Sequence, residues 1–180
     1  MTEVKRLKVG EGKISGYLSI FLSIICLGGV ICAFFPEYLT TADFRESYDP
    51  QIVKWSLMGV AFLSLGFAIT SFVLSKRTKW GFFGLIILIA ATILGSFLPE
   101  SDGIESKAFA LGFDWLLIDI FLSALIFIPI ELFLPKRLNQ SKFHVEWRTD
   151  LVYFVIGHLL IQVTGVLVQW PSVAFFGGIG

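Results

Sequence analysis

The sequence contains few of the residues that build catalytic or metal sites. Its 180 residues include two histidines and two cysteines, Cys26 and Cys32. These cysteines would lie about 9 Å apart along one helix axis, which is too far for a disulfide. The chain has no metal-binding spacing, phosphate-binding loop, nucleophile elbow or Ser/His/Asp set. The residues themselves therefore predict no catalytic centre and no metal site.

The chain also lacks net charge and internal repetition. Its 14 basic and 14 acidic residues give a formal charge of zero, so overall charge gives no reason to expect a nucleic-acid partner. No period of about 20–50 residues recurs, which argues against a solenoid. The absence of repeats also gives no sign of the inverted halves of many transporters.

Long apolar runs dominate the chain instead. Hydrophobic residues make up 56% of the sequence, and the mean hydropathy is +0.81. A helix rises about 1.5 Å per residue, so roughly 20 apolar residues cross a hydrocarbon core about 30 Å thick. Lipid offers the backbone no hydrogen-bond partners, so each run is predicted to be a helix. The five runs are Ile14–Phe35, Ile52–Leu74, Trp80–Phe97, Leu111–Leu134 and Leu151–Trp170.

The basic residues predict how these helices cross the membrane. Eleven of the 14 lysines and arginines fall before the first run, between the second and third, or between the fourth and fifth. Positive residues are retained on the cytoplasmic side. We therefore expect an all-α, multi-pass transmembrane bundle of about five helices in the bacterial inner membrane, with a cytoplasmic N-terminus. The acidic connection 36–51 is predicted as a loop, with Pro36 and Pro50 as helix stops.

Small residues and helix ends give further local predictions. Ser64 and Ala68 form a face suited to close helix packing, and Gly12-x-x-x-Gly16 has helix-contact spacing at the membrane edge. Asp114 is expected in the first turn of its helix, where a carboxylate complements the dipole. Thr149 or Asp150 is expected to cap the fifth helix. The predicted interfacial anchors are Lys136, Arg137, Trp147 and Arg148.

Polar side chains inside the apolar runs are the candidate intramembrane contacts. His158, Gln162, Gly165 and Gln169 share one face of the fifth helix, which should pack against protein. His158 is interpreted as a proton carrier, metal ligand or substrate contact. The alternative is a single hydrogen bond between helices that fixes their packing.

Two carboxylates on the fourth helix complete this set. Glu131 is expected at a depth similar to that of His158, and one hypothesis is that the two approach each other. The alternative is that Glu131 reaches the interface or pairs with Arg137 or Arg148. Asp119, nearer the outer leaflet, is expected to have a structural role.

The sequence from residue 113 to residue 170 resembles a known family. The segments that carry the resemblance are Ile130–Arg137, Glu146–Phe154 and Gly157–Leu160. The most specific part is a Trp-Arg-Thr-Asp entry followed by a helix that bears His-Leu-Leu. These segments resemble the region before the catalytic core in bacterial members of the sterol desaturase and fatty acid hydroxylase superfamily. We therefore divide the chain into two regions. Residues 1–110 are expected to form an N-terminal membrane region with three transmembrane helices. Residues 111–180 form a two-helix segment that resembles the start of this core and is expected to be truncated.

The resemblance implies a membrane-bound, non-haem di-iron oxidoreductase that uses O₂ and electrons to hydroxylate or desaturate a lipid. The implied partners are membrane lipids, a lipid or sterol substrate and an electron-donor protein. The two irons of the family are held by clustered histidines, which are expected downstream of Gly180 because two histidines cannot supply them. No iron-ligand role is carried onto His158, and this chain alone is expected to bind no cofactor and to be inactive. Two alternatives stay open: a non-catalytic membrane scaffold or subunit partner, and a small transporter.

Overall fold

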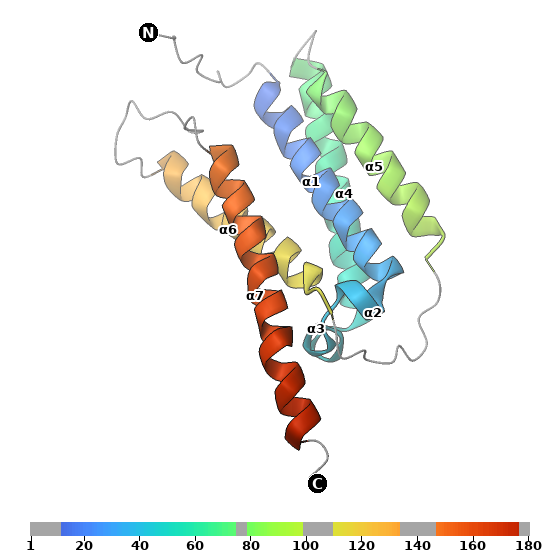
Figure 1. The fold of residues 1–180 in the computed structure, drawn as a ribbon. Coiled ribbons are helices and arrows are strands. Elements are labelled where there is room, and N and C mark those ends of the chain that lie inside the picture. Colours follow the sequence, from blue (N-terminus) through green and yellow to red (C-terminus); the bar gives the residue numbers. More distant parts are fainter. Residues whose placement is uncertain (1–11, 75–78, 99–109, 134–146, 177–180) are drawn as a thin grey trace, which may run out of the picture.

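The computed structural model describes residues 12–74, 79–98, 110–133 and 147–176, and within these ranges it is helical, with no strand. Two short helices, α2 (Pro36–Leu39) and α3 (Ala42–Ser47), connect the first long helix to the next. The five long helices are α1 (Lys13–Phe34), α4 (Pro50–Leu74), α5 (Trp80–Ser96), α6 (Phe113–Phe133) and α7 (Trp147–Phe176). The predicted all-helical fold is thus confirmed for the described residues (Figure 1).

Among the described residues, three helices are long and apolar enough to cross a membrane. They are α1, α4 and the Phe113–Ile130 part of α6. Helix α5 has 17 residues, and α7 contributes a shorter apolar stretch, Thr149–Gly165. The coarse prediction of a helical membrane protein is therefore supported, and the number of five spans stays a prediction.

The long helices alternate in direction. In Figure 1, α1, α5 and α7 run one way, whereas α4 and α6 run the other way. The start of α1, the end of α4, the start of α5, the end of α6 and the start of α7 consequently lie at one end of the molecule. The short helices α2 and α3 lie at the opposite end.

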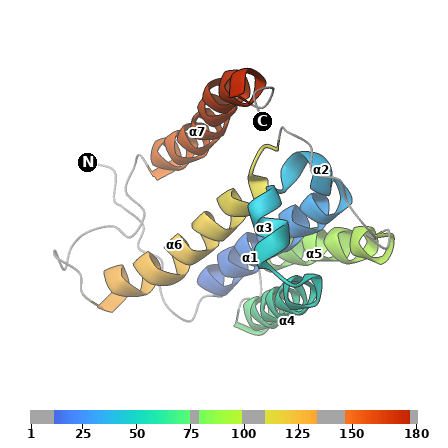
Figure 2. The same ribbon diagram turned by 90° about the horizontal axis from the view of Figure 1, so that it is seen from below.

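Helix α1 is the centre of the packed part of the molecule, and α4 and α5 both pack along it (Figures 1 and 2). Small residues allow this approach. A Cβ added at Gly84 of α5 would collide with the Ser19 hydroxyl of α1, and a Cβ added at Gly16 would come 2.8 Å from the Trp80 Cβ. Ala68 of α4 is also fully buried. Backbones that approach this closely gain dispersion contacts, which stabilise helix pairs in lipid.

Buried serine hydroxyls join the same three helices. The Oγ atoms of Ser23 on α1 and Ser64 on α4 lie 2.7 Å apart. Each hydroxyl carries one proton, which leaves two arrangements. Either Ser64 donates to Ser23 and Ser23 donates to the Gly84 carbonyl oxygen on α5 at 2.8 Å, or Ser23 donates to Ser64 and Ser64 donates to the Ser19 carbonyl oxygen at 2.9 Å. Each buried hydroxyl thus has hydrogen-bond partners on a neighbouring helix, so burying these two serines costs little free energy.

The connection between α1 and α4 differs from the predicted loop, because it contains α2 and α3. Pro36 and Pro50 are the first residues of α2 and α4, where the missing N–H of proline removes no helical hydrogen bond. The prolines therefore begin helices as well as ending the preceding ones. Arg45 holds the segment together: one guanidinium nitrogen donates to the Pro36 carbonyl at 2.6 Å and to the carbonyl and hydroxyl of Thr40 at 3.0 Å.

Helix α7 begins earlier than predicted, at Trp147 rather than Leu151. The prediction that Thr149 or Asp150 caps this helix is wrong, because both residues lie inside its first turn. Asp150 still complements the positive end of the dipole from that position. Lys136 and Arg137 lie outside the described residues, as do the side chains of Trp147 and Arg148.

Candidate functional site

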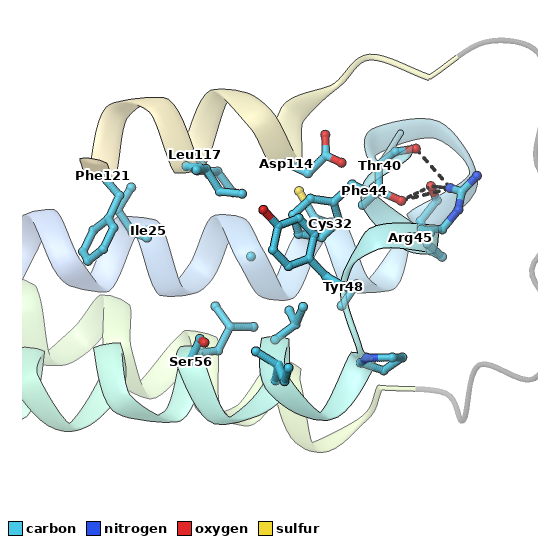
Figure 3. A pocket seen from close by; sticks show the side chains of 18 of the residues that line it. Ile25, Cys32, Thr40, Phe44, Arg45, Tyr48, Ser56, Asp114, Leu117 and Phe121 are labelled. Atoms are coloured by element: carbon cyan, nitrogen blue, oxygen red, sulfur yellow. Dashed lines mark hydrogen bonds between the residues drawn. The ribbon is translucent and has the colours of Figure 1, made fainter. Parts of the chain in front are cut away.

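A cavity of about 610 Å³ lies between α1, α4 and α6 and is bounded at one end by α2 and α3 (Figure 3). Its volume is within the range of pockets that hold small molecules, about 300–1,000 Å³. The lining is mainly apolar over the long helices and includes Ile25, Leu57, Val60, Leu117, Ile118 and Phe121. Most of the polar lining residues gather at the end formed by α2 and α3, whereas Ser56 lies along the length of the cavity. The residues at the polar end include Thr40, Arg45, Glu46, Tyr48 and Asp114. The cavity therefore has an apolar length and a polar end.

Two adjacent glycines of α1 determine how closely the neighbouring helices approach. A Cβ added at Gly29 would come 2.5 Å from the Leu57 Cδ2 of α4, and one at Gly28 would come 2.8 Å from the Leu117 Cδ2 of α6. Each leucine consequently packs directly against the α1 backbone, at a glycine that has no side chain. The same two leucines line the cavity, so the Gly28–Gly29 pair fixes the position of its walls.

Asp114 is the buried charge of this site. It lies in the first turn of α6, as predicted, and is 4% exposed. Its Oδ2 accepts hydrogen bonds from the Thr41 backbone N–H at 2.9 Å and from the Thr41 hydroxyl at 3.1 Å. The indole N–H of Trp115 donates to the Thr41 hydroxyl oxygen at 2.9 Å. Asp114 thus fastens the start of α6 to the turn between α2 and α3.

The second carboxylate oxygen of Asp114 is different. Its Oδ1 is buried and has no hydrogen-bond partner among the described residues. Leaving a buried polar atom without a partner costs about 1–3 kcal/mol, and more for a charged group. Such an atom in a native structure calls for an explanation, such as a bound molecule. This oxygen has almost no accessible surface, so it is an unsatisfied acceptor packed behind the polar end of the cavity and does not face into it.

The segment around this polar end carries excess negative charge. Residues 36–50 contain four carboxylates and one cation, Arg45. One guanidinium nitrogen of Arg45 is directed to oxygens of Pro36 and Thr40. A positively charged or hydrogen-bond-donating group is consequently favoured here over an anionic one.

A second polar cluster joins α6 and α7. The Nε2 of His158 lies 3.2 Å from the carbonyl oxygen of Gly112, and its Nδ1 lies 3.7 Å from the Oδ2 of Asp119. The His158 side chain is 13% exposed, whereas that of Asp119 is 50% exposed. Gly112 has a left-handed backbone (φ 59°) that favours glycine. A Cβ added there would come 2.7 Å from the side-chain amide of Gln162.

The structure therefore brings together three of the four predicted intramembrane polar residues: His158, Gln162 and Asp119. Glu131 lies 19 residues beyond Gly112 on α6, roughly 28 Å along the helix axis. The structure thus does not place Glu131 beside His158, and the Glu131 side chain itself lies outside the described residues. The early start of α7 accounts for part of this separation, because it places His158 about one turn, roughly 5 Å, deeper than expected.

Sequence reasoning did not find the cavity or the roles of Thr41 and Arg45. Asp114 was recognised only as a carboxylate suited to a helix dipole. One available signal was the Thr40-Thr41 pair directly before the Ala42–Ser47 stretch. A threonine just before a helix caps its first turn, and its hydroxyl can make a second hydrogen bond. The Thr41 side chain indeed accepts from the Phe44 N–H at 3.3 Å.

The residues described do not suit a pair of irons. They contain no group of three or more His, Cys, Asp or Glu side chains that could hold a metal ion. No chemical step is therefore assigned to iron in this chain. Comparisons of the sequence and structure with known protein families, curated proteins and solved structures gave no match, so none of them links the chain to the sterol desaturase and fatty acid hydroxylase superfamily.

Proposed function

We propose that this chain is an integral membrane protein that binds a lipid-like amphiphile in the cavity between α1, α4 and α6. The observation that carries this proposal is the cavity itself, with apolar walls from three helices and one polar end. A ligand with an apolar tail and a polar headgroup matches that division. Such a ligand is abundant in a bilayer, so the protein meets it without a diffusion step through water.

Five membrane crossings form part of this proposal. Helix α5 packs along α1, and α7 runs in the same direction as α1 and α5 (Figure 1). Both carry large apolar side chains that are exposed in the isolated chain, such as Ile93 on α5 and Ile161 and Leu167 on α7. Contiguous apolar surface of this kind suits contact with lipid.

The N-terminus is proposed to be cytoplasmic, in the bacterial inner membrane. The basic segments of the sequence adjoin the start of α1, the end of α4, the start of α5, the end of α6 and the start of α7, which share one end of the molecule. The positive-inside rule places that end in the cytoplasm. Reporter tags after residues 36 and 75 should therefore report opposite compartments, and the same compartment for both would contradict this topology.

The direct test of ligand binding is native mass spectrometry of the protein released from mild detergent. We expect a bound amphiphile of defined mass, retained at collision energies that strip the annular lipids. A protein that loses all adducts together with the annular lipids would contradict the proposal.

A second proposal rests on the residues that resemble the sterol desaturase and fatty acid hydroxylase superfamily. In this case the bound lipid or sterol is a substrate, and the chain supplies the membrane region of a di-iron oxidoreductase that also uses an electron-donor protein. Two observations support this proposal: the sequence of the Trp147–Leu160 segment, and a cavity whose apolar walls and polar end suit a lipid. The genomic reading frame tests it: histidine clusters downstream of residue 180 favour the enzyme. A stop codon there, or a continuation without such clusters, favours a non-catalytic scaffold or subunit partner.

A further inference from the structure

We propose that the amphiphile in this cavity has an uncharged headgroup that carries hydroxyls, as a monoacylglycerol does, and that the hydroxyls of Tyr48 and Ser56 bind this headgroup. The inference rests on the proposed lipid-binding function and specifies its ligand. The headgroup would lie between the end of α3 and the first turns of α4. The alkyl tail would follow the apolar walls that α1, α4 and α6 provide.

The first step is that two hydroxyls reach the cavity without a partner. Tyr48 follows α3 directly, Ser56 lies on α4, and both residues line the cavity. The Tyr48 ring extends into the cavity, and its hydroxyl is directed away from Arg45 (Figure 3). Neither hydroxyl has a hydrogen-bond partner among the described residues. Tyr48 is 40% exposed and Ser56 is also exposed, so a ligand in the cavity can reach both.

The free hydroxyl of Ser56 differs from those of other helical residues. Thr70 on α4 and Thr92 on α5 each donate to the backbone carbonyl four residues earlier, as serine and threonine commonly do inside helices. Ser56 makes no such bond within the described part of α4. A hydroxyl can both donate and accept. Tyr48 and Ser56 together therefore suit a headgroup that also has several donors and acceptors, such as glycerol.

The second step is the charge of the headgroup. Arg45 and Glu46 both line the polar end, so a charged headgroup of either sign meets a like charge there. Asp114 is engaged by Thr41 through Oδ2, and its Oδ1 does not face into the cavity. Moving a charge out of water without a dedicated partner is costly. An uncharged headgroup with hydroxyls avoids this cost and still offers hydrogen-bond donors to the acidic segment.

The third step is the depth of the cavity. Its lining runs from Ile25 to Ala33 on α1 and from Pro50 to Val60 on α4, which is roughly 12–15 Å along the helix axes. This length is about half of a hydrocarbon core about 30 Å thick. The cavity therefore occupies one half of the bilayer, at the end where α2 and α3 lie. A lipid tail of one leaflet fits along it, with the headgroup toward the membrane surface.

The experiment measures binding of three lipids with tails of equal length: monopalmitoylglycerol, hexadecyl sulfate and hexadecyltrimethylammonium. The two charged lipids keep their charge at any pH used. The protein is placed in phosphatidylcholine nanodiscs with each lipid at a known mole fraction, and empty nanodiscs provide the partition background. We expect monopalmitoylglycerol to bind about five-fold or more tightly than either charged lipid, which corresponds to at least one neutral hydrogen bond.

Conservative variants then test the two hydroxyls. Tyr48→Phe and Ser56→Ala should each weaken the binding of monopalmitoylglycerol several-fold, up to about five-fold, and leave the binding of the two charged lipids unchanged. The matched controls are Tyr153→Phe on α7 and Ser96→Ala on α5, whose hydroxyls lie outside the cavity lining. Both controls should bind all three lipids as the unmodified protein does.

The outcomes separate this inference from the proposed function. A charged lipid that binds as tightly as monopalmitoylglycerol, or an unchanged affinity for monopalmitoylglycerol in both Tyr48→Phe and Ser56→Ala, would overturn the inference while leaving the lipid site in place. No binding of any of the three lipids above the background would overturn both. If a variant does not fold, the comparison of the three lipids on the unmodified protein decides the question alone.

Discussion

The backbone N–H of Thr41 donates a 2.9 Å hydrogen bond to the Oδ2 of Asp114, across 73 positions of sequence. This bond joins the turn between α2 and α3 to the first turn of α6. The Thr41 hydroxyl adds a second bond to the same oxygen and accepts one from Trp115. Thr41 therefore links the end of the cavity formed by α2 and α3 to the start of α6.

Replacing Thr41 with valine should destabilise the protein by about 1–3 kcal/mol, because it leaves the Trp115 N–H unpaired and removes one donor from Asp114. The loss is measured by reversible unfolding in mixed micelles. The control is Thr70→Val, whose hydroxyl only returns to the Gly66 carbonyl on the exposed side of α4. A Thr41→Val protein as stable as the control would show that this junction does not hold the structure together.

Helix packing around α1 gives a second prediction. Gly84→Ala would drive a Cβ into the Ser19 hydroxyl and should cost about 1–3 kcal/mol through forced separation of α1 and α5. Gly59→Ala on α4 has open space around it and should be neutral or slightly stabilising. The two variants are compared by the same unfolding measurement, and equal stabilities would contradict the close contact of α1 with α5.

The serine contact between α1 and α4 allows a double-mutant cycle. Ser23→Ala and Ser64→Ala should show a coupling of about 0.6 kcal/mol, with an upper bound near 1.7 kcal/mol, as found for hydrogen bonds between membrane helices. The 2.7 Å separation of their Oγ atoms predicts this coupling. Strictly additive effects would indicate that the two hydroxyls do not interact.

The contact between α6 and α7 gives a fourth prediction. Gly112→Ala should loosen this contact, because the residue has a positive φ and lies under the Gln162 amide. Hydrogen exchange of the α7 backbone should rise in this variant. Gly165→Ala, on α7 with open space around it, should leave exchange unchanged. Unaltered hydrogen exchange in Gly112→Ala would show that the contact at Gly112 does not stabilise α7.

The sequence predicts the long helices well because the bilayer dictates their length and their apolar character. The cavity was not predictable in the same way, since it depends on which faces of α1, α4 and α6 stay apart. The helical periodicity of α7 correctly indicates that His158 and Gln162 share a face toward protein. The same prediction is wrong at Gly165, which has open space around it, and the side chain of Gln169 lies outside the described residues. Periodicity alone does not identify Gly112 and Asp119 as the partners of this face, because this depends on where α7 begins.

The most direct test of the central claim fills the cavity. Val53 on α4 lines it, whereas Val73 on the same helix is 78% exposed on the outer surface. Native mass spectrometry of Val53→Trp and Val73→Trp compares the same substitution inside and outside the site. We predict that Val53→Trp loses the retained amphiphile and that Val73→Trp keeps it at the level of the unmodified protein. An amphiphile retained equally in both variants would show that the cavity between α1, α4 and α6 is not the binding site.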